Sequence, residues 1–188
     1  APGCMLNAIG LQNPGVDYFI EHDLPWLKEQ GTVVIANIAG NTPEEYCAMA
    51  EKLSDTNVDM LEMNISCPNV KEGGVQFGTS CIGVEQITAA VRKHCTKPLM
   101  VKLSPNVTDI GDIAASAEAG GADAISMINT LTGMRIDIQT RRPIIRNNTG
   151  GVSGPALLPI AVRMIWQAYN RVKIPIVGMG GVSNWKDA

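Results

Sequence analysis

The chain has 188 residues, 45% of them hydrophobic and 18% charged, with a formal net charge of −3 and an aromatic content of 4%. This composition is typical of one globular domain with a real core, and it lacks the basic charge and the stacking aromatics of nucleic-acid-binding proteins. No apolar run reaches about 18 residues, and residues 1–10 lack the pattern of a signal peptide, so neither a membrane span nor a leader is expected.

The first half of the chain alternates helical and strand-like segments. A short helix is predicted at 24–31, before an apolar strand at 32–40. A helix at 42–55 follows, with a threonine as its N-cap, a proline at its first position and acidic residues in its first turn. A second apolar strand is predicted at 58–66, and a helix with basic residues near its end at 83–95.

The second half continues the same alternation. Strands are predicted at 98–104, 123–129 and 174–181, and helices at 108–121 and 155–172. The strands are rich in Val, Ile, Leu and Met and show little polar alternation, which is typical of strands buried on both faces.

These repeating strand–helix units predict an α/β fold. Right-handed crossovers between successive strands require a parallel sheet. Two arrangements compete, an open doubly wound sheet and an eight-stranded barrel. Five strands are too few for a complete barrel, for which about 250 residues are typical. We therefore expect a single domain over residues 1–188 that forms the interior of a (β/α)8 TIM barrel, incomplete at both ends.

Cysteine and histidine usage limits the chemistry. The five cysteines are odd in number and widely spaced, and no Cys-x-x-Cys motif occurs. A disulfide framework or a zinc site is not expected, and the reducing cytoplasm fits best. The two histidines, His22 and His94, lie in segments that read as helical, so neither a histidine-based triad nor a metal site is predicted.

Polar residues recur at the carboxyl ends of the predicted strands, where barrels and doubly wound sheets bind their ligands. The strands end in or carry Asn37, Asn64, Lys102 and Asn129. Amides offer both donors and acceptors, so they suit a flat ring edged with carbonyl and N–H groups. The alternatives are that each asparagine caps a turn and that Lys102 belongs to a structural ion pair.

Two glycine-rich turns suggest a phosphate site. The sequences NNTGGVSGPALLPIAV, from residue 147, and GMGGVSNWKDA, from residue 178, each lead from a glycine turn towards a predicted helix. Backbone N–H groups at such turns, together with the positive end of a helix, can hold a phosphate. Neither sequence matches a dinucleotide-binding or P-loop motif, so the glycines alone are weak evidence.

Cys67, in the motif NISCPNVKEGG, is the candidate catalytic residue. No histidine lies near it in sequence to activate a nucleophile, and no neighbours have the spacing of metal ligands. A thiol with a pKa of about 8.5 can act as a general base towards a weakly acidic proton. Pro68 stiffens the turn, and Gly73 and Gly74 could form a loop that closes over a substrate. The alternative is a small core cysteine.

Seven motifs together give the sequence a family resemblance. They are MLNAIGLQNPG, IANIAG, NISCPNVKEGG, VKLSPNVTDI, MINTLTGMRID, GGVSGPALLPIA and GMGGVS. The sequence resembles the class 1B, NAD-linked dihydroorotate dehydrogenases, whose fold is an FMN-binding (β/α)8 barrel. The resemblance implies an oxidoreductase that converts (S)-dihydroorotate to orotate in de novo pyrimidine biosynthesis. It also implies a cytoplasmic homodimer within a heterotetramer, whose FAD and 2Fe–2S subunit passes electrons to NAD⁺.

The resemblance also implies a role for each matching residue. Cys67 would take a proton from C5 of dihydroorotate, and Lys102 would stabilise negative charge on the reduced flavin. Substrate would be bound by Asn7, Ala8, Ile9, Gly10, Leu11, Asn64, Asn69, Asn129 and Thr130. FMN would be contacted by Asn37, Asn64, Lys102 and Ile128, and its phosphate would be held by Gly154, Gly180 and Gly181. No metal ligand is implied.

The sequence departs from the family by omission. An upstream lysine near flavin and substrate and a Gly-Thr phosphate turn on the last strand belong to the family pattern, and neither occurs here. We therefore expect this chain alone to bind FMN poorly or not to fold, because an unclosed barrel exposes strand edges. Two alternatives stay open, a pyrimidine-reducing domain like that of dihydropyrimidine dehydrogenases and a non-catalytic fragment of such a barrel.

Overall fold

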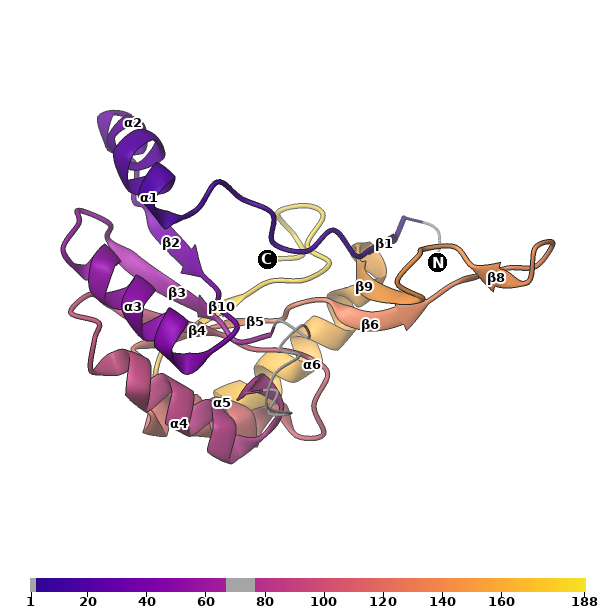
Figure 1. Cartoon of the computed structure of the whole chain (residues 1–188). Coiled ribbons are helices and arrows are strands. Elements are labelled where there is room, and N and C mark those ends of the chain that lie inside the picture. The colour runs from indigo at the N-terminus through magenta and orange to yellow at the C-terminus, as the bar shows by residue number, and fades with distance from the viewer. Residues whose placement is uncertain (1–2, 67–76) are drawn as a thin grey trace.

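A parallel sheet of five strands forms the centre of the protein (Figure 1). The computed structural model describes residues 3–66 and 77–188. The strands are β2 (Ile35–Ile38), β3 (Met60–Asn64), β4 (Leu99–Lys102), β5 (Ala124–Met127) and β10 (Ile176–Gly178), and each neighbouring pair is parallel. Each lies within one of the five predicted strands, so these predictions are confirmed.

The order of the strands decides between the two predicted arrangements. Across the sheet they run β10-β5-β4-β3-β2, which is their order along the chain without a reversal. A doubly wound sheet reverses its order at a switch point and carries helices on both faces. Here helices α3 to α6 all lie on one side of the sheet (Figure 1). The sheet is therefore an arc of a (β/α) barrel, and among the described strands the arc is not closed.

Four helices cover the outer face of this arc. They are α3 (Pro43–Ser54), α4 (Cys81–Arg92), α5 (Ile110–Ala119) and α6 (Leu158–Tyr169), the last following a 3-10 turn, η3 (Pro155–Leu157). The predicted N-cap of α3 is present, since Thr42 Oγ1 accepts a hydrogen bond from the backbone N–H of Glu45. The four predicted helices are confirmed. Within the described part of the chain, none has the length and apolar content needed to cross a bilayer.

The first helical segment begins earlier than predicted. It runs through α1 (Val16–Tyr18), a π-turn η1 (Phe19–Asp23) and α2 (Leu24–Glu29), whereas the sequence predicted a helix only from residue 24. Pro25 resembles a helix start in sequence because proline is favoured in the first turn. In the structure Pro25 is the second residue of α2, within a helical segment that continues from the π-turn before it.

A small antiparallel sheet was not predicted. It pairs β1 (Met5–Asn7), β9 (Thr149–Ser153) and β6 (Leu131–Met134) in the order β1-β9-β6, and a hairpin of β7 (Ile136–Asp137) and β8 (Arg142–Pro143) extends beyond it. Strand β9 occupies the segment interpreted from sequence as a glycine-rich phosphate loop, which corrects that interpretation for residues 149–153. The glycines allow close strand contact, because a Cβ at Gly150 would lie 2.4 Å from the carbonyl oxygen of Asn7.

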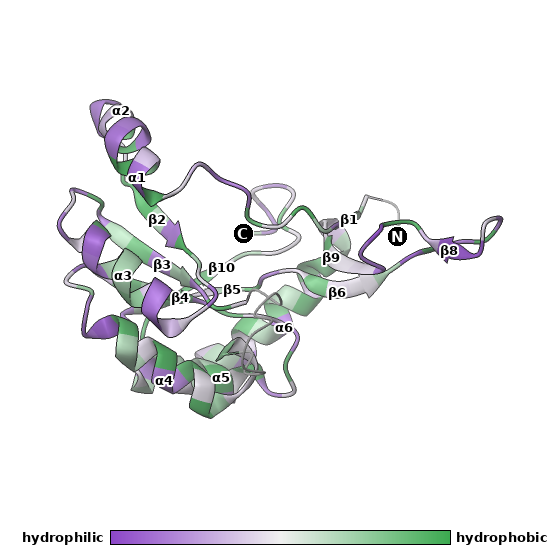
Figure 2. Cartoon of the chain, in the orientation of Figure 1, coloured by the Kyte–Doolittle hydropathy of each residue, from purple (hydrophilic) through white to green (hydrophobic). Residues whose placement is uncertain are grey.

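The two faces of the parallel sheet have different chemistry. On the helix side, Leu61, Leu99, Val101 and Ile125 are fully buried and join the core that packs against the helices. Hydrophobic and hydrophilic residues alternate around α3 and α4, so one side of each helix can join that core (Figure 2).

The inner face of the arc carries polar residues in register. Asn37 is the Cα partner of Glu62, Asn64 of Lys102, and Lys102 of Ser126. Because partners in neighbouring strands point to the same face, these polar side chains form one continuous group. The carboxyl half of the inner face is therefore polar while the helix side is apolar.

Asp59 connects the first helical segment to the sheet. Its Oδ2 accepts hydrogen bonds from Lys28 Nζ at 2.5 Å and from the backbone N–H of Val34 at 2.7 Å. These two hydrogen bonds, that of Lys28 first, lower the pKa of the Asp59 carboxyl. A group whose pKa is lowered on folding stabilises the protein above its unfolded-state pKa, and this contribution is lost as pH falls through the folded-state value.

We therefore expect Asp59→Asn to lower the midpoint of urea unfolding at neutral pH. The difference from the parent protein should shrink as pH falls below about 4, where Asp59 becomes protonated in the unfolded parent, and vanish below the lowered pKa of the folded state. Asp55→Asn, in the exposed turn after α3, is the control for removing one carboxylate. A stability difference for Asp59→Asn that stayed constant down to the lowest pH would contradict the assigned linkage.

Candidate active site

A cavity of about 820 Å³ lies at the carboxyl ends of β2 to β5, between the parallel arc and the antiparallel sheet. Its wall contains strand-end residues from the arc and residues of β1, β6 and β9 or their flanking loops. The residues implicated by sequence that line it are Asn7, Ala8, Gly10, Leu11, Asn37, Asn64, Lys102, Asn129 and Thr130. The fold therefore brings together residues that are more than 120 positions apart in the chain.

Other residues implicated by sequence lie elsewhere. Ile9 is 80% exposed and is not part of the cavity wall, and Ile128 is buried in the hydrophobic core and does not line the cavity either. Cys67 and Asn69 lie outside the described residues, so their roles stay predictions. Ser66, which directly precedes Cys67 in sequence, lines the cavity.

The predicted phosphate glycines also lie apart from the cavity wall. Gly180 and Gly181 both have positive φ, and a Cβ on Gly181 would lie 2.3 Å from the backbone nitrogen of Leu158, the first residue of α6. The turn after β10 therefore packs its backbone directly against the start of a helix. Gly154 also has positive φ and packs against the N-terminal segment instead. A Cβ on Gly154 would lie 2.5 Å from the carbonyl oxygen of Gly3.

The Asn64 and Asn129 side chains are held in a hydrogen-bonded chain. Asn64 Oδ1 accepts from the backbone N–H of Ser66 at 3.2 Å and from Asn129 Nδ2 at 3.4 Å. Asn129 Oδ1 in turn accepts from the backbone N–H of Thr130 at 2.8 Å. With its oxygen engaged, the Asn64 amide has its Nδ2 donor available for a ligand.

Asn106, in the loop between β4 and α5, supports this hydrogen-bonded chain of side chains, and sequence reasoning did not identify it. Its Nδ2 donates to Ser104 Oγ at 3.2 Å and to the Thr130 carbonyl oxygen at 3.0 Å, and its Oδ1 accepts from the backbone N–H of Thr132. Asn106 thus holds the start of β6, through the residue before the strand and its second residue. Asn106 lies within the family motif VKLSPNVTDI, but nothing in the local pattern distinguished it from an ordinary turn residue.

Glu62 is a second residue that sequence reasoning missed. It lies in the middle of β3, is 8% exposed, and lines the cavity. Its Oε1 accepts from Ser126 Oγ at 2.5 Å, its Oε2 accepts from Asn37 Nδ2, and Lys102 Nζ lies 3.9 Å from Oε2. A single charge within the apolar strand MLEMN was a signal equal to that of Lys102 in VKLSP.

The backbone of Asn64 is anchored from the helix layer. The buried Tyr46 of α3 donates its hydroxyl to the Asn64 carbonyl oxygen at 2.7 Å. Removing the hydroxyl leaves this acceptor without that partner in a buried site, so we expect Tyr46→Phe to cost about 1–2 kcal/mol of unfolding free energy. Chemical denaturation measures the loss, and Tyr169→Phe, 73% exposed on α6, is the control. Equal stability of both variants would contradict the expectation.

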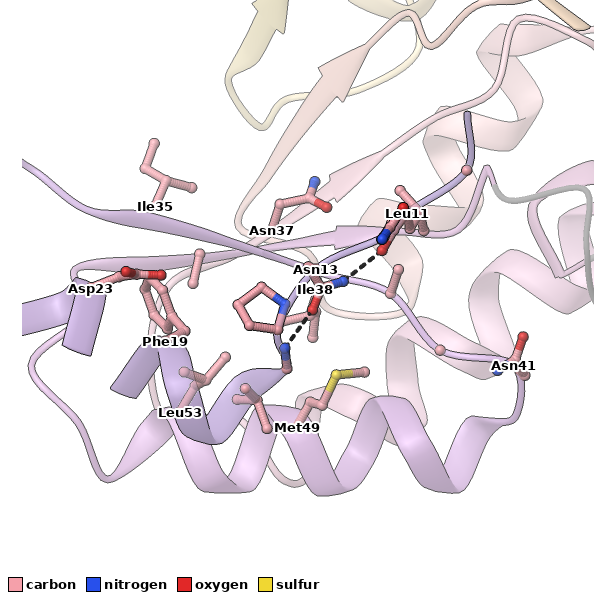
Figure 3. A pocket seen from close by; sticks show the side chains of 18 residues that line it. Leu11, Asn13, Phe19, Asp23, Ile35, Asn37, Ile38, Asn41, Met49 and Leu53 are labelled. Carbon is pink, nitrogen blue, oxygen red and sulfur yellow. Dashed lines mark hydrogen bonds between the residues drawn. The ribbon is translucent and has the colours of Figure 1, made fainter. Parts of the chain in front are cut away.

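A second cavity of about 790 Å³ adjoins the first, between residues 10–16 and the β2–α3 unit (Figure 3). The two share Gly10, Leu11 and Asn37. Asn13 shapes the loop above it, because its Nδ2 donates to the Leu11 carbonyl oxygen and its Oδ1 accepts from the Gly15 N–H. Much of the remaining wall is apolar, including Phe19, Ile35, Met49 and Leu53, so the polar groups concentrate in the first cavity.

A parallel arc in sequential order, with amides and a lysine gathered at its carboxyl ends, defines a (β/α)-barrel protein with a polar ligand site. The family model for dihydroorotate dehydrogenase matches residues 1–188. The chain belongs to the dihydroorotate dehydrogenase family.

Three curated relatives carry the same name, dihydroorotate dehydrogenase B (NAD(+)), catalytic subunit. The chain is 59% identical to the one from Alkaliphilus metalliredigens, 57% to that from Alkaliphilus oremlandii and 58% to that from Lachnoclostridium phytofermentans. Each match spans 186 residues, which is 99% of this chain and 62% of the relative. The chain thus corresponds to less than two thirds of the relatives' length.

Proposed function

We propose that this chain carries catalytic residues of an FMN-dependent dihydroorotate dehydrogenase, which oxidises (S)-dihydroorotate to orotate. The observation that supports this function best is the convergence of Asn37, Asn64, Asn129 and Lys102 on one cavity. Dihydroorotate is a six-membered ring edged with alternating carbonyl and N–H groups and carrying a carboxylate. Amides match the ring edges, and a lysine together with backbone N–H groups matches an anion. The names of the relatives point to the same substrate.

The residues present fit an FMN group. Asn37, Asn64 and Lys102 would contact the flavin from the strand ends, with Ile128 beneath. Gly180 and Gly181, in the turn after β10, would hold the phosphate with their backbone N–H groups, and Gly181 packs against the first residue of α6, whose positive end would favour an anion. Gly154 would complete that site. When bound, FMN supplies the acceptor for the hydride that leaves C6 of dihydroorotate.

The substrate would lie where the antiparallel sheet meets the arc. Asn7, Ala8, Gly10 and Leu11, at the end of β1 and just after it, would line one side. The side chains of Asn64, Asn69, Asn129 and Thr130 would bind the amide edges and the carboxylate. Asn64 Nδ2 would donate to a ring carbonyl, because its Oδ1 already accepts two hydrogen bonds. The Asn106 contacts on Thr130 and Thr132 would keep this wall in place.

Cys67 would be the general base. Its thiolate would take the C5 proton while the C6–H bond breaks, so that the C5=C6 double bond of orotate forms from the electron pair of the C5–H bond. The proposal is supported by Ser66, the residue before Cys67, which lines the cavity.

The electrons would leave through a partner. The relatives' names describe a catalytic subunit and NAD⁺, which supports the presence of a second subunit. That subunit would carry FAD and a 2Fe–2S cluster and reduce NAD⁺. A homodimer within a heterotetramer, in the cytoplasm, would complete the assembly.

Substrate selectivity tests the proposed function. The full-length protein is assayed with dihydroorotate and with dihydrouracil, using an artificial electron acceptor so that no partner subunit is needed. We expect turnover of dihydroorotate and little of dihydrouracil, because only the former carries a carboxylate. Preference for dihydrouracil would instead favour a pyrimidine-reducing domain of the dihydropyrimidine dehydrogenase type, and a full-length protein without flavin or turnover would favour a non-catalytic barrel.

A further inference from the structure

Glu62 is a buried carboxylate that lines the cavity and has no part in the proposed reaction. It is 8% exposed and occupies the inner face of β3. Its partners come from three other strands, Asn37 in β2, Lys102 in β4 and Ser126 in β5. Both carboxylate oxygens accept hydrogen bonds.

A buried charge is costly unless it is well paired, so this arrangement needs an explanation. Each partner is oriented by the carboxylate. Asn37 turns its Nδ2 towards Glu62, so its Oδ1 is the part of the amide available to a ligand. Lys102 places its ammonium 3.9 Å from Oε2 and lines the cavity at the same time. Glu62 therefore sets both the direction of one amide and the local charge around the lysine.

We propose that Glu62 is a positioning residue that orients Asn37 and Lys102 and makes a bound flavin harder to reduce. The proposal rests on the proposed function, because it assumes that FMN occupies this cavity. Lys102 alone would favour the reduced flavin, which carries extra negative charge. The carboxylate of Glu62 opposes that effect. The balance of the two charges then sets the reduction potential of the site.

Two variants separate the charge of Glu62 from its shape. Glu62→Gln removes the charge and keeps the size, whereas Glu62→Asp keeps the charge and shortens the side chain. The flavin midpoint potential and the dissociation constant of FMN are measured on the full-length protein. Glu85→Gln, on the exposed surface of α4, is the control for removing one negative charge.

We expect Glu62→Gln to make the flavin potential more positive and to weaken FMN binding by about tenfold, the effect of losing one charged hydrogen bond. Glu62→Asp should leave the potential close to that of the parent, even if FMN binds more weakly. Glu85→Gln should change neither quantity. A parental potential and affinity in Glu62→Gln would overturn the proposal, and so would equal shifts in the Gln and Asp variants, which indicate a structural effect only.

If Glu62→Gln does not fold, Ser126→Ala is the variant that tests the proposal. It removes the donor to Oε1 without removing the charge, and we expect FMN binding to weaken by about threefold with the potential unchanged. Unchanged affinity would overturn the positioning role. A parent protein that bound no flavin at all would instead overturn the proposed function, so the two failures are distinguishable.

Discussion

Replacing Cys67 by alanine should slow reduction of the flavin by dihydroorotate by about 10²–10⁴-fold, because alanine cannot accept the C5 proton. FMN should stay bound, because Cys67 is not among the residues proposed to contact the flavin. Rapid mixing without oxygen, followed by the loss of flavin absorbance, measures the rate. Cys67→Ser should also be slow at neutral pH, because a serine hydroxyl is deprotonated to a far smaller extent at that pH than a thiol.

Cys81→Ala is the matched control for this experiment. Cys81 is an exposed cysteine at the start of α4, on the helix layer, and its removal should leave the rate unchanged. Flavin reduction at the parental rate in Cys67→Ala would show that another group takes the proton.

Replacing Lys102 by methionine should have the second large effect. Methionine has a similar length but no charge. Glu62 would therefore lose its nearby cation, and the proposed flavin site would lose its positive group. We expect the rate of flavin reduction to fall by about 10²–10³-fold, comparable to the loss of one preorganised donor in other enzymes. Weaker FMN binding should accompany it, measured by fluorescence titration.

Lys93→Met is the control for the loss of one lysine, because Lys93 is the exposed C-cap of α4. If Lys102→Met reduced its flavin as fast as the parent, Lys102 would be a structural ion-pair partner of Glu62 and nothing more.

The parallel arc was predictable because its signals are local. Apolar runs without polar alternation marked each strand, and caps such as Thr42 marked the helices. The gathering of Asn37, Asn64, Lys102 and Asn129 followed from one rule, that parallel strands present their carboxyl ends at the same edge. The order of the strands across the sheet could not be derived from the sequence, because a doubly wound sheet and a barrel show the same alternation of strands and helices. The structure and the family match decided between these two folds.

The antiparallel sheet was missed because its strands depend on contacts across the fold. Strand β9 contains adjacent glycines, which disfavour a strand by propensity. They are needed where they are, since a Cβ on Gly151 would lie 2.2 Å from Thr130 Oγ1. Such steric requirements involve residues more than 20 positions apart and leave no periodic pattern. The glycines were therefore interpreted as a ligand loop instead of a packed strand.

Glu62 was missed for a different reason. Lys102 was singled out because a charge within an apolar strand needs a partner, and the same argument applied to Glu62 one strand earlier. The two are in fact 3.9 Å apart. Considering buried charges in pairs across neighbouring strands would have identified both.

The most direct test of the whole account is to mix the full-length, FMN-loaded protein with dihydroorotate in the absence of oxygen. The account predicts that the flavin absorbance disappears and that orotate forms in an amount equal to the flavin reduced. A flavin that stays oxidised in the presence of excess dihydroorotate would contradict the claim that this cavity oxidises a dihydropyrimidine carboxylate.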